Sequence, residues 1–231
     1  MTLAVLCAGA AKGLVADLEP AFTAETAVAI VGTFGAVGAL REELVAGAPC
    51  DVIVLTAALI DALEKDGHVV PGSAAPLGTV RTGIAVRAGE ALPGIQDAAA
   101  LRSTLLGASR LLFPDPQRAT AGIHFVEVLR RLGIHEDVAP RCATFPNGAT
   151  AMRALAEMRE RGAVGCTQVT EINYTPGVAL VGPLPAGLDL ATVYTAAVCT
   201  RVRDRALALR FVRMLGGEES RELRLRGGFE F

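Results

Sequence analysis

Short apolar segments alternate with helix-like segments along almost the whole chain. The apolar segments are the length of buried strands, and the first three occupy residues 3–7, 28–31 and 52–55. Helical patterns follow each of them, over residues 12–24, 37–45 and 57–65. Parallel strands have to be joined by long crossovers, which are usually helices. The alternation therefore predicts an α/β fold with largely parallel sheets.

The second half of the chain continues this alternation. The 231 residues suffice for one large domain or for two smaller lobes with a sizeable core. Further strands are expected at 80–87, 109–113, 165–169, 178–181 and 191–199. Further helices are expected at 98–106, 150–161 and 204–215, and another begins at residue 120.

Composition excludes several classes of function. The net charge is −2, there is no Trp, and Tyr occurs twice, so neither the basic face nor the stacking aromatics of a nucleic-acid-binding protein are present. No apolar run approaches the roughly 20 residues of a membrane-spanning helix. The five cysteines are odd in number and widely spaced, and a free Cys beside an apolar strand behaves as a small hydrophobic residue. We expect no metal, no cofactor and no nucleic-acid partner.

The segment from Gly32 to Leu55 is the most informative single stretch. Gly32, Gly35 and Gly38 predict a glycine-rich turn that leads into a helix ending at Gly47. Glycines at a helix start let the backbone approach a ligand, and the first N–H groups of the helix are unpaired. The positive end of the helix dipole then favours an anion, although the same pattern is also ordinary punctuation between a strand and a helix.

Several motifs carry a resemblance to a known family. Phe34, Leu40 and Leu44 precede Ala46-Gly47-Ala48-Pro49-Cys50-Asp51, and Asp115-Pro116 precedes Ala121-Gly122-Ile123. Their order and spacing are similar to those of the periplasmic molybdate-binding proteins. This resemblance implies a two-lobed type II periplasmic-binding-protein-like fold with a central cleft. It further implies the following boundaries: lobe 1 at 1–80 with 190–231, lobe 2 at 81–189, and crossovers near 79–83 and 182–191.

The same resemblance implies where a ligand binds. Ala10 and Val37 stand at positions where that family has ligand hydroxyls, and Gln168 aligns with a ligand Tyr. Thr120 is expected to cap a helix, and Arg118 and Arg81 are candidates for pairing with a carboxylate. The expected ligand-binding residues are Ala10, Ala11, Lys12, Gly35, Val37, Gly38, Arg81, Arg118, Thr120, Ala121, Gly122, Thr150 and Gln168. No residue is assigned a catalytic role.

The resemblance implies a monomeric solute-binding protein that delivers a small anion to the permease of an ABC transporter. Because two hydroxyl donors are replaced by apolar side chains, an organic carboxylate is expected in preference to a molybdate-like oxyanion. The alternative is an aconitate isomerase-like enzyme, since relatives of that kind share the motifs at residues 67–73 and 182–185. No recognisable signal peptide precedes residue 3, which favours the enzyme, whereas the lack of an evident general base favours the binder. We expect a periplasmic protein if a signal peptide has been removed, and a cytoplasmic one otherwise.

Overall fold

The structure, a computed structural model, describes residues 2–231. The chain forms two compact units: unit 1 comprises the described residues 2–80 together with Thr192–Phe231, and unit 2 is Arg81–Ala191. The chain leaves unit 1 within strand β4 (Ala75–Arg87) and returns to it within strand β9 (Ala191–Val198).

Unit 1 is built on a sheet with the strand order β2-β1-β3-β9. Strand β1 pairs in parallel with both β2 and β3, and β9 runs antiparallel to β3. The elements of this unit, besides β9 and the start of β4, are β1 (Thr2–Ala8), η1 (Gly9–Ala11), α1 (Lys12–Thr26), β2 (Ala29–Gly35), α2 (Val37–Val45), β3 (Val52–Thr56), α3 (Ala57–Lys65), α9 (Arg205–Gly216), η3 (Glu218–Ser220) and α10 (Arg221–Gly227).

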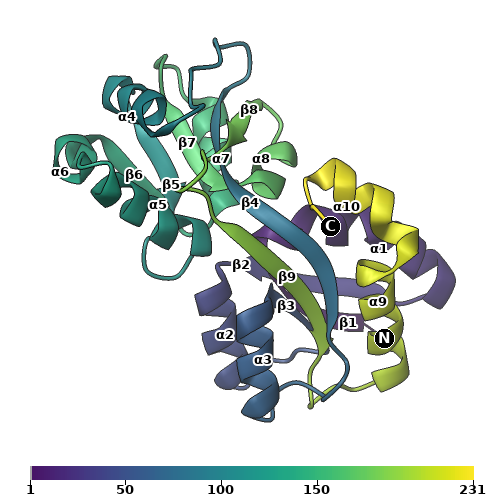
Figure 1. The fold of residues 1–231 in the computed structure, drawn as a ribbon. Helices are drawn as coiled ribbons and strands as arrows, with labels where there is room; N and C mark the ends of the chain where they lie inside the picture. The colour runs from purple at the N-terminus through teal and green to yellow at the C-terminus, as the bar shows by residue number, and fades with distance from the viewer. Residues whose placement is uncertain (1) are drawn as a thin grey trace. The chain divides into compact units, whose positions relative to one another are not determined.

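Helices cover both faces of this sheet. Figure 1 shows α2 and α3 on one face and α1, α9 and α10 on the other. Phe22 of α1 and Phe211 of α9 are fully buried and meet edge to face, with 4.9 Å between their ring centroids. Strand β3 is buried at Val52, Ile53, Val54 and Leu55, as expected for a central strand that helices cover on both sides.

Unit 2 contains a second mixed sheet. Strand β5 pairs in parallel with β6 and β7, and β4 runs antiparallel to both β7 and β8. The elements of this unit, besides β4, are α4 (Ala98–Gly107), β5 (Leu111–Pro114), α5 (Thr120–Arg131), α6 (His135–Val138), η2 (Ala139–Arg141), β6 (Cys142–Phe145), α7 (Gly148–Glu157), β7 (Val164–Gln168), α8 (Val169–Asn173) and β8 (Val178–Pro183).

Two apolar clusters lie on opposite faces of this second sheet. One includes Leu101 of α4 and Phe125 of α5, and the other includes Met152 of α7 and Ile172 of α8. In Figure 1, α4, α5 and α6 accordingly lie on one side of β5, and α7 and α8 lie on the other. The parallel strands are therefore enclosed by their own crossover helices, which is the arrangement that the alternating sequence pattern predicted.

Three local expectations were wrong. Gly32 and Gly35 are residues of β2 and do not form a turn, because all seven residues of β2 pair with β1. The helix expected at 150–161 spans Gly148–Glu157, since Asn147 caps its start. The expected strand 165–169 ends at Gln168, because Val169 begins the short helix α8. The described chain contains no helix with the length and hydrophobicity that a membrane span requires.

Candidate functional site

Unit 1 gathers three helix N-termini at one edge of its sheet. Because β1, β2 and β3 are parallel, their carboxyl ends lie at the same edge, and each leads into a helix there. Within residues 2–231, no side chain caps the N-terminus of α1, α2 or α3. Uncapped N–H groups with a helix dipole behind them are suited to an anion.

The six residues expected in unit 1 all lie at this edge. Strand register places Ala8 opposite Gly35, so the connection after β1 adjoins the connection after β2. Lys12 contributes the one positive charge of this group, and its Nζ lies 5.5 Å from the centroid of the Phe34 ring. The six residues occupy η1 and the starts of α1 and α2, with one at the end of β2: Ala10, Ala11, Lys12, Gly35, Val37 and Gly38.

Gly32 has a packing role rather than the expected role in a turn. A Cβ atom added to Gly32 would lie 2.5 Å from the tip of the Phe34 ring. The glycine therefore leaves room for this ring, which lies beside Lys12. The donors at the start of α2 come from the helix alone, without a glycine loop before it.

Unit 2 also gathers helix N-termini at one strand edge, after β5, β6 and β7. Ala119, not Thr120, is the N-cap of α5, so the expectation of a threonine cap was wrong. In the part of the chain that the structure describes, no side chain caps α5. Thr120, Ala121 and Gly122 form its first turn and present backbone donors.

The approach to α5 is fixed by Asp115. Its Oδ1 accepts hydrogen bonds from the backbone N–H groups of Gln117 at 2.7 Å and Arg118 at 3.2 Å. The first turn of α5 requires a glycine at position 122, because a Cβ added to Gly122 would overlap the carbonyl oxygens of Pro114 and Asp115. The N-terminus of α5 is thus held tightly against the end of β5, and Arg118 lies just before it.

The N-terminus of α7 differs, because the protein supplies its own partners there. Asn147 Oδ1 accepts from both the N–H and the hydroxyl of Thr150, each at 2.9 Å. The Glu171 carboxylate accepts from the backbone N–H groups of Gly148 and Ala149, and from the Thr167 hydroxyl at 2.5 Å. Thr150, an expected ligand-binding residue, is therefore already engaged within unit 2.

Glu171 was not singled out from the sequence, although it is one of the few buried acidic side chains. It is 7% exposed, and burial raises the pKa of its carboxyl group, an effect that the hydrogen bonds from Thr167 and the backbone only partly offset. Its carboxylate also accepts from the N–H of Gln168, the N-cap of α8. One carboxylate thus accepts hydrogen bonds from backbone N–H groups at the starts of two helices, α7 and α8.

Gln168 is the most unusual residue at this edge. Its side chain is 2% exposed, and within residues 2–231 neither its Oε1 nor its Nε2 has a hydrogen-bond partner. Thr82 lies opposite it on β4, and the hydroxyl of Thr82 is likewise buried and unpartnered in the described structure. Buried polar atoms are normally paired, so this cluster requires an explanation.

Arg81 is engaged with the protein's own carboxylate. Its Nη1 lies 3.0 Å from Asp189 Oδ2, and the N–H of the next residue, Thr82, donates to Leu190 O at 3.0 Å. His124, on α5, bonds through Nε2 to Leu188 O at 2.8 Å. The contacts of Arg81 and Thr82 join the two ends of unit 2, and the contact of His124 links α5 to the end of the unit.

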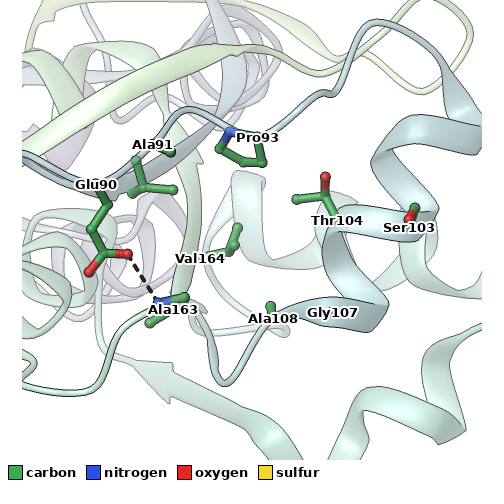
Figure 2. Close-up of a pocket in the computed structure, with 11 residues that line it drawn as sticks. Glu90, Ala91, Pro93, Ser103, Thr104, Gly107, Ala108, Ala163 and Val164 are labelled. Carbon is green, nitrogen blue, oxygen red and sulfur yellow. Dashed lines mark hydrogen bonds between the residues drawn. The ribbon is translucent and has the colours of Figure 1, made fainter.

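A cavity of about 280 Å³ lies elsewhere in unit 2, and Figure 2 shows its lining. It borders Val164 at the amino end of β7, whereas Gln168 ends this strand. Glu90 is its acidic residue, and Glu90 Oε2 accepts from Gly162 N at 3.0 Å. None of the expected ligand-binding residues lines this cavity.

The amino-acid sequence of this chain is similar to those of two characterised proteins. Aconitate isomerase from a Pseudomonas species is 24% identical over 228 residues, which are 95% of this chain and 84% of that protein. The molybdate-binding protein ModA of Escherichia coli K12 is 25% identical over 229 residues, 98% of this chain and 88% of that protein.

Solved structures show the same fold. The periplasmic molybdate-binding protein of Azotobacter vinelandii aligns over 99% of both chains, with a TM-score of 0.82 at 21% identity. The sulfate-binding protein SubI of Mycobacterium tuberculosis aligns over 99% of this chain and 86% of its own, with a TM-score of 0.74 at 17% identity. The expected α/β fold of the two-lobed periplasmic-binding-protein kind is thereby confirmed. A family model described as bacterial extracellular solute-binding protein matches residues 3–230, and the chain belongs to this family.

Proposed function

We propose that the solute of this ABC-transporter-type binding protein is an organic acid that carries both a carboxylate and a hydrogen-bond donor. The observation that carries this proposal is the buried, unpartnered amide of Gln168, in the part of the chain that the structure describes. An amide group donates through Nε2 and accepts through Oε1. A ligand that satisfies both atoms has to offer an acceptor and a donor side by side.

This requirement separates organic acids from inorganic oxyanions. A fully deprotonated tetrahedral oxyanion only accepts hydrogen bonds, so it would leave Oε1 of Gln168 unpaired, at a cost of about 1–3 kcal/mol. A hydroxy acid offers carboxylate oxygens to Nε2 and a hydroxyl hydrogen to Oε1. The Thr82 hydroxyl, opposite Gln168 on β4, supplies a further donor and acceptor.

Unit 1 supports the same choice of ligand. Ala10 and Val37 are buried and apolar, so their side chains offer no hydrogen-bond donor to an oxyanion. Negative charge on the ligand would be balanced by the uncapped helix N-termini and by Lys12, with Arg118 and Arg81 as further candidates. Enclosure of the ligand between the two lobes, export of the protein and delivery to a permease stay predictions of the resemblance.

We expect an organic acid to raise the melting temperature in a thermal-shift panel. At about 100 times the dissociation constant, the stabilisation is about 2.7 kcal/mol, or about 5–10 °C for a chain of this length. The panel contains citrate, tricarballylate, cis- and trans-aconitate, molybdate, tungstate and sulfate. Citrate and tricarballylate differ only in the hydroxyl, and citrate is expected to bind more tightly. A response to molybdate and tungstate alone would refute the proposal.

Replacing Gln168 with leucine is expected to weaken binding of the acid found in the panel by about 10- to 100-fold, as loss of one or two hydrogen bonds implies. The ligand-free protein should become about 1 kcal/mol more stable, because an unpaired buried amide is removed. Titration calorimetry and urea unfolding measure the two effects. Thr170→Val is the matched control: Thr170 Oγ1 is also buried and unpartnered in the described structure, so stability should rise while affinity stays unchanged. Equal affinity of Gln168→Leu and the wild type would remove Gln168 from the site.

The alternative function is isomerisation of a tricarboxylate, which the 24% identical aconitate isomerase favours. Such an enzyme needs a general base beside the substrate. Glu171 is a buried carboxyl next to the Gln168 cluster, but its oxygens accept from Thr167 and from backbone N–H groups of two helix starts. This engagement favours the binder. Entry of solvent deuterium into cis-aconitate in the presence of the protein, followed by NMR, would favour the enzyme instead.

A further inference from the structure

Two cysteines that are far apart in the sequence meet at one end of the sheet of unit 1. Cys50 lies just before β3 and Cys199 directly after β9, and the two are 149 positions apart in the sequence. Their Sγ atoms are 3.4 Å apart. The two strands are antiparallel, and Cys199 N donates to Asp51 O at 3.0 Å, so the backbones around the pair are held together by the ladder.

We propose that Cys50 and Cys199 are a site of disulfide formation. A disulfide has an S–S distance of about 2.05 Å, so the two sulfurs need to approach by only about 1.4 Å. Small rotations about χ1 supply such a movement without a shift of the backbone that carries the residues.

The geometry selects this pair among the five cysteines. Cys7, Cys50 and Cys142 each donate from Sγ to a nearby carbonyl oxygen, at 3.3, 3.1 and 3.4 Å respectively. The contact between two sulfur atoms is what sets Cys50 and Cys199 apart. Cys166 lies in β7, in an apolar cluster of unit 2. Cys50 and Cys199 both belong to unit 1, and each lies in a connection outside the regular strands, where a local opening can expose it.

The reaction is a thiol–disulfide exchange with a disulfide oxidant, for example oxidised glutathione. The Cys50 thiolate attacks one sulfur of the oxidant, forms a mixed disulfide and releases one thiol. Cys199 then attacks the Cys50 sulfur, the protein disulfide forms, and the second thiol leaves. The two protons and two electrons lost by the cysteines are found in the two released thiols.

The reaction is expected to be slow in the folded protein. Cys50 is 5% exposed and Cys199 is 1% exposed, so the oxidant has little access. The hydrogen bond with Cys50, together with burial, raises the pKa of the Cys199 thiol well above its usual value, which keeps the reactive thiolate scarce. Oxidation should therefore occur during folding or during brief opening of the connections before β3 and after β9.

The expected consequence is a more stable fold. The cross-link closes a loop that contains all of unit 2, from Arg81 to Ala191, and long closed loops restrict the unfolded chain most strongly. The melting temperature of the oxidised protein should exceed that of the reduced protein by about 5–10 °C.

The experiment refolds the full chain from denaturant in a buffer of reduced and oxidised glutathione, then blocks the remaining thiols and maps the peptides by mass spectrometry. We expect a cross-linked peptide pair containing Cys50 and Cys199, three blocked cysteines, and a thermal shift that a reductant reverses. Five blocked cysteines, or a different pairing, would overturn the proposal.

Variants assign the thermal shift to this bond. Cys50→Ala and Cys199→Ala should each lose both the cross-link and the shift. Cys142→Ala is the control, because Cys142 lies in unit 2 and donates to a carbonyl oxygen, and it should keep both. Peptide mapping of the wild type decides the question even if one variant does not fold. A shift that persists in Cys50→Ala would contradict the stabilising role.

Discussion

Replacing Asp51 with alanine is expected to destabilise the protein by about 2–3 kcal/mol. Asp51 is 3% exposed, and its Oδ2 accepts from Ala4 N at 2.8 Å and from Arg203 Nη2 at 2.6 Å. Its Oδ1 accepts from Arg203 N at 3.1 Å. The substitution would leave these donors without their acceptor. This cost lies below the about 3–5 kcal/mol of a broken, fully buried ion pair, because the Arg203 side chain is half exposed and can be solvated.

Urea and thermal unfolding measure this loss, and the expected fall in melting temperature is about 5–10 °C. Glu136→Ala is the control, since Glu136 is almost fully exposed and its pairing with His135 should contribute little. A change of less than about 0.5 kcal/mol for Asp51→Ala would mean that water replaces the carboxylate at the start of β3.

Asp51 is also expected to make the stability of the protein depend on pH. Burial alone would raise the pKa of Asp51, but the hydrogen bonds from Arg203 and Ala4 outweigh it and hold the pKa below its usual value. A carboxyl with a lowered folded-state pKa stabilises the protein above its unfolded-state pKa, near pH 4, and loses this contribution as the pH falls through the folded-state pKa. The stability difference between the wild type and Asp51→Ala should therefore narrow below about pH 4.

The sequence predicted elements well where local signals and packing agree. The helices 37–45 and 57–65 begin and end as expected, because each lies between a short apolar strand and a glycine close after its end. The short elements α6, β6 and α8 were missed. Four- and five-residue elements carry too little periodicity to be recognised, and their formation depends on neighbours such as β5, which pairs with β6.

The candidate site could be predicted only in outline. Helix starts at α2 and α5 were expected from the sequence, but their cap residues were not, since a cap depends on backbone angles that composition does not determine. Glu171 was missed because its partners, Gly148 and Ala149, lie on another helix. A second reason is that Glu171 stands three residues after the N-cap of α8, and this N-cap is Gln168 instead of the Ser or Thr of the usual capping box. The sulfur contact between Cys50 and Cys199 likewise depends on the pairing of β3 with β9.

Replacing Gly148 with alanine is expected to destabilise the protein by about 2–4 kcal/mol. Helix propensity alone predicts the opposite, a gain of up to about 1 kcal/mol for Gly→Ala. However, an added Cβ would overlap Thr167 Oγ1 and Glu171 Oε2, and both of these side chains are buried. To make room, Glu171 would have to give up hydrogen bonds from the N–H groups at the starts of α7 and α8. Each such group left unpaired costs about 1–3 kcal/mol, which exceeds the propensity gain.

Gly107→Ala separates the effect of helix propensity from the effect of steric overlap. Gly107 ends α4, and an added Cβ there would meet no atom within 4 Å, so this variant should be neutral or slightly stabilised. Urea unfolding of both variants measures the difference. Because Glu171 also accepts from Gln168 N, its displacement should disturb the Gln168 amide, and Gly148→Ala should weaken binding of the organic acid as well. A stable Gly148→Ala protein with unchanged affinity would mean that Glu171 moves freely. The start of α7 would then be a second candidate for an anion in unit 2, beside the start of α5.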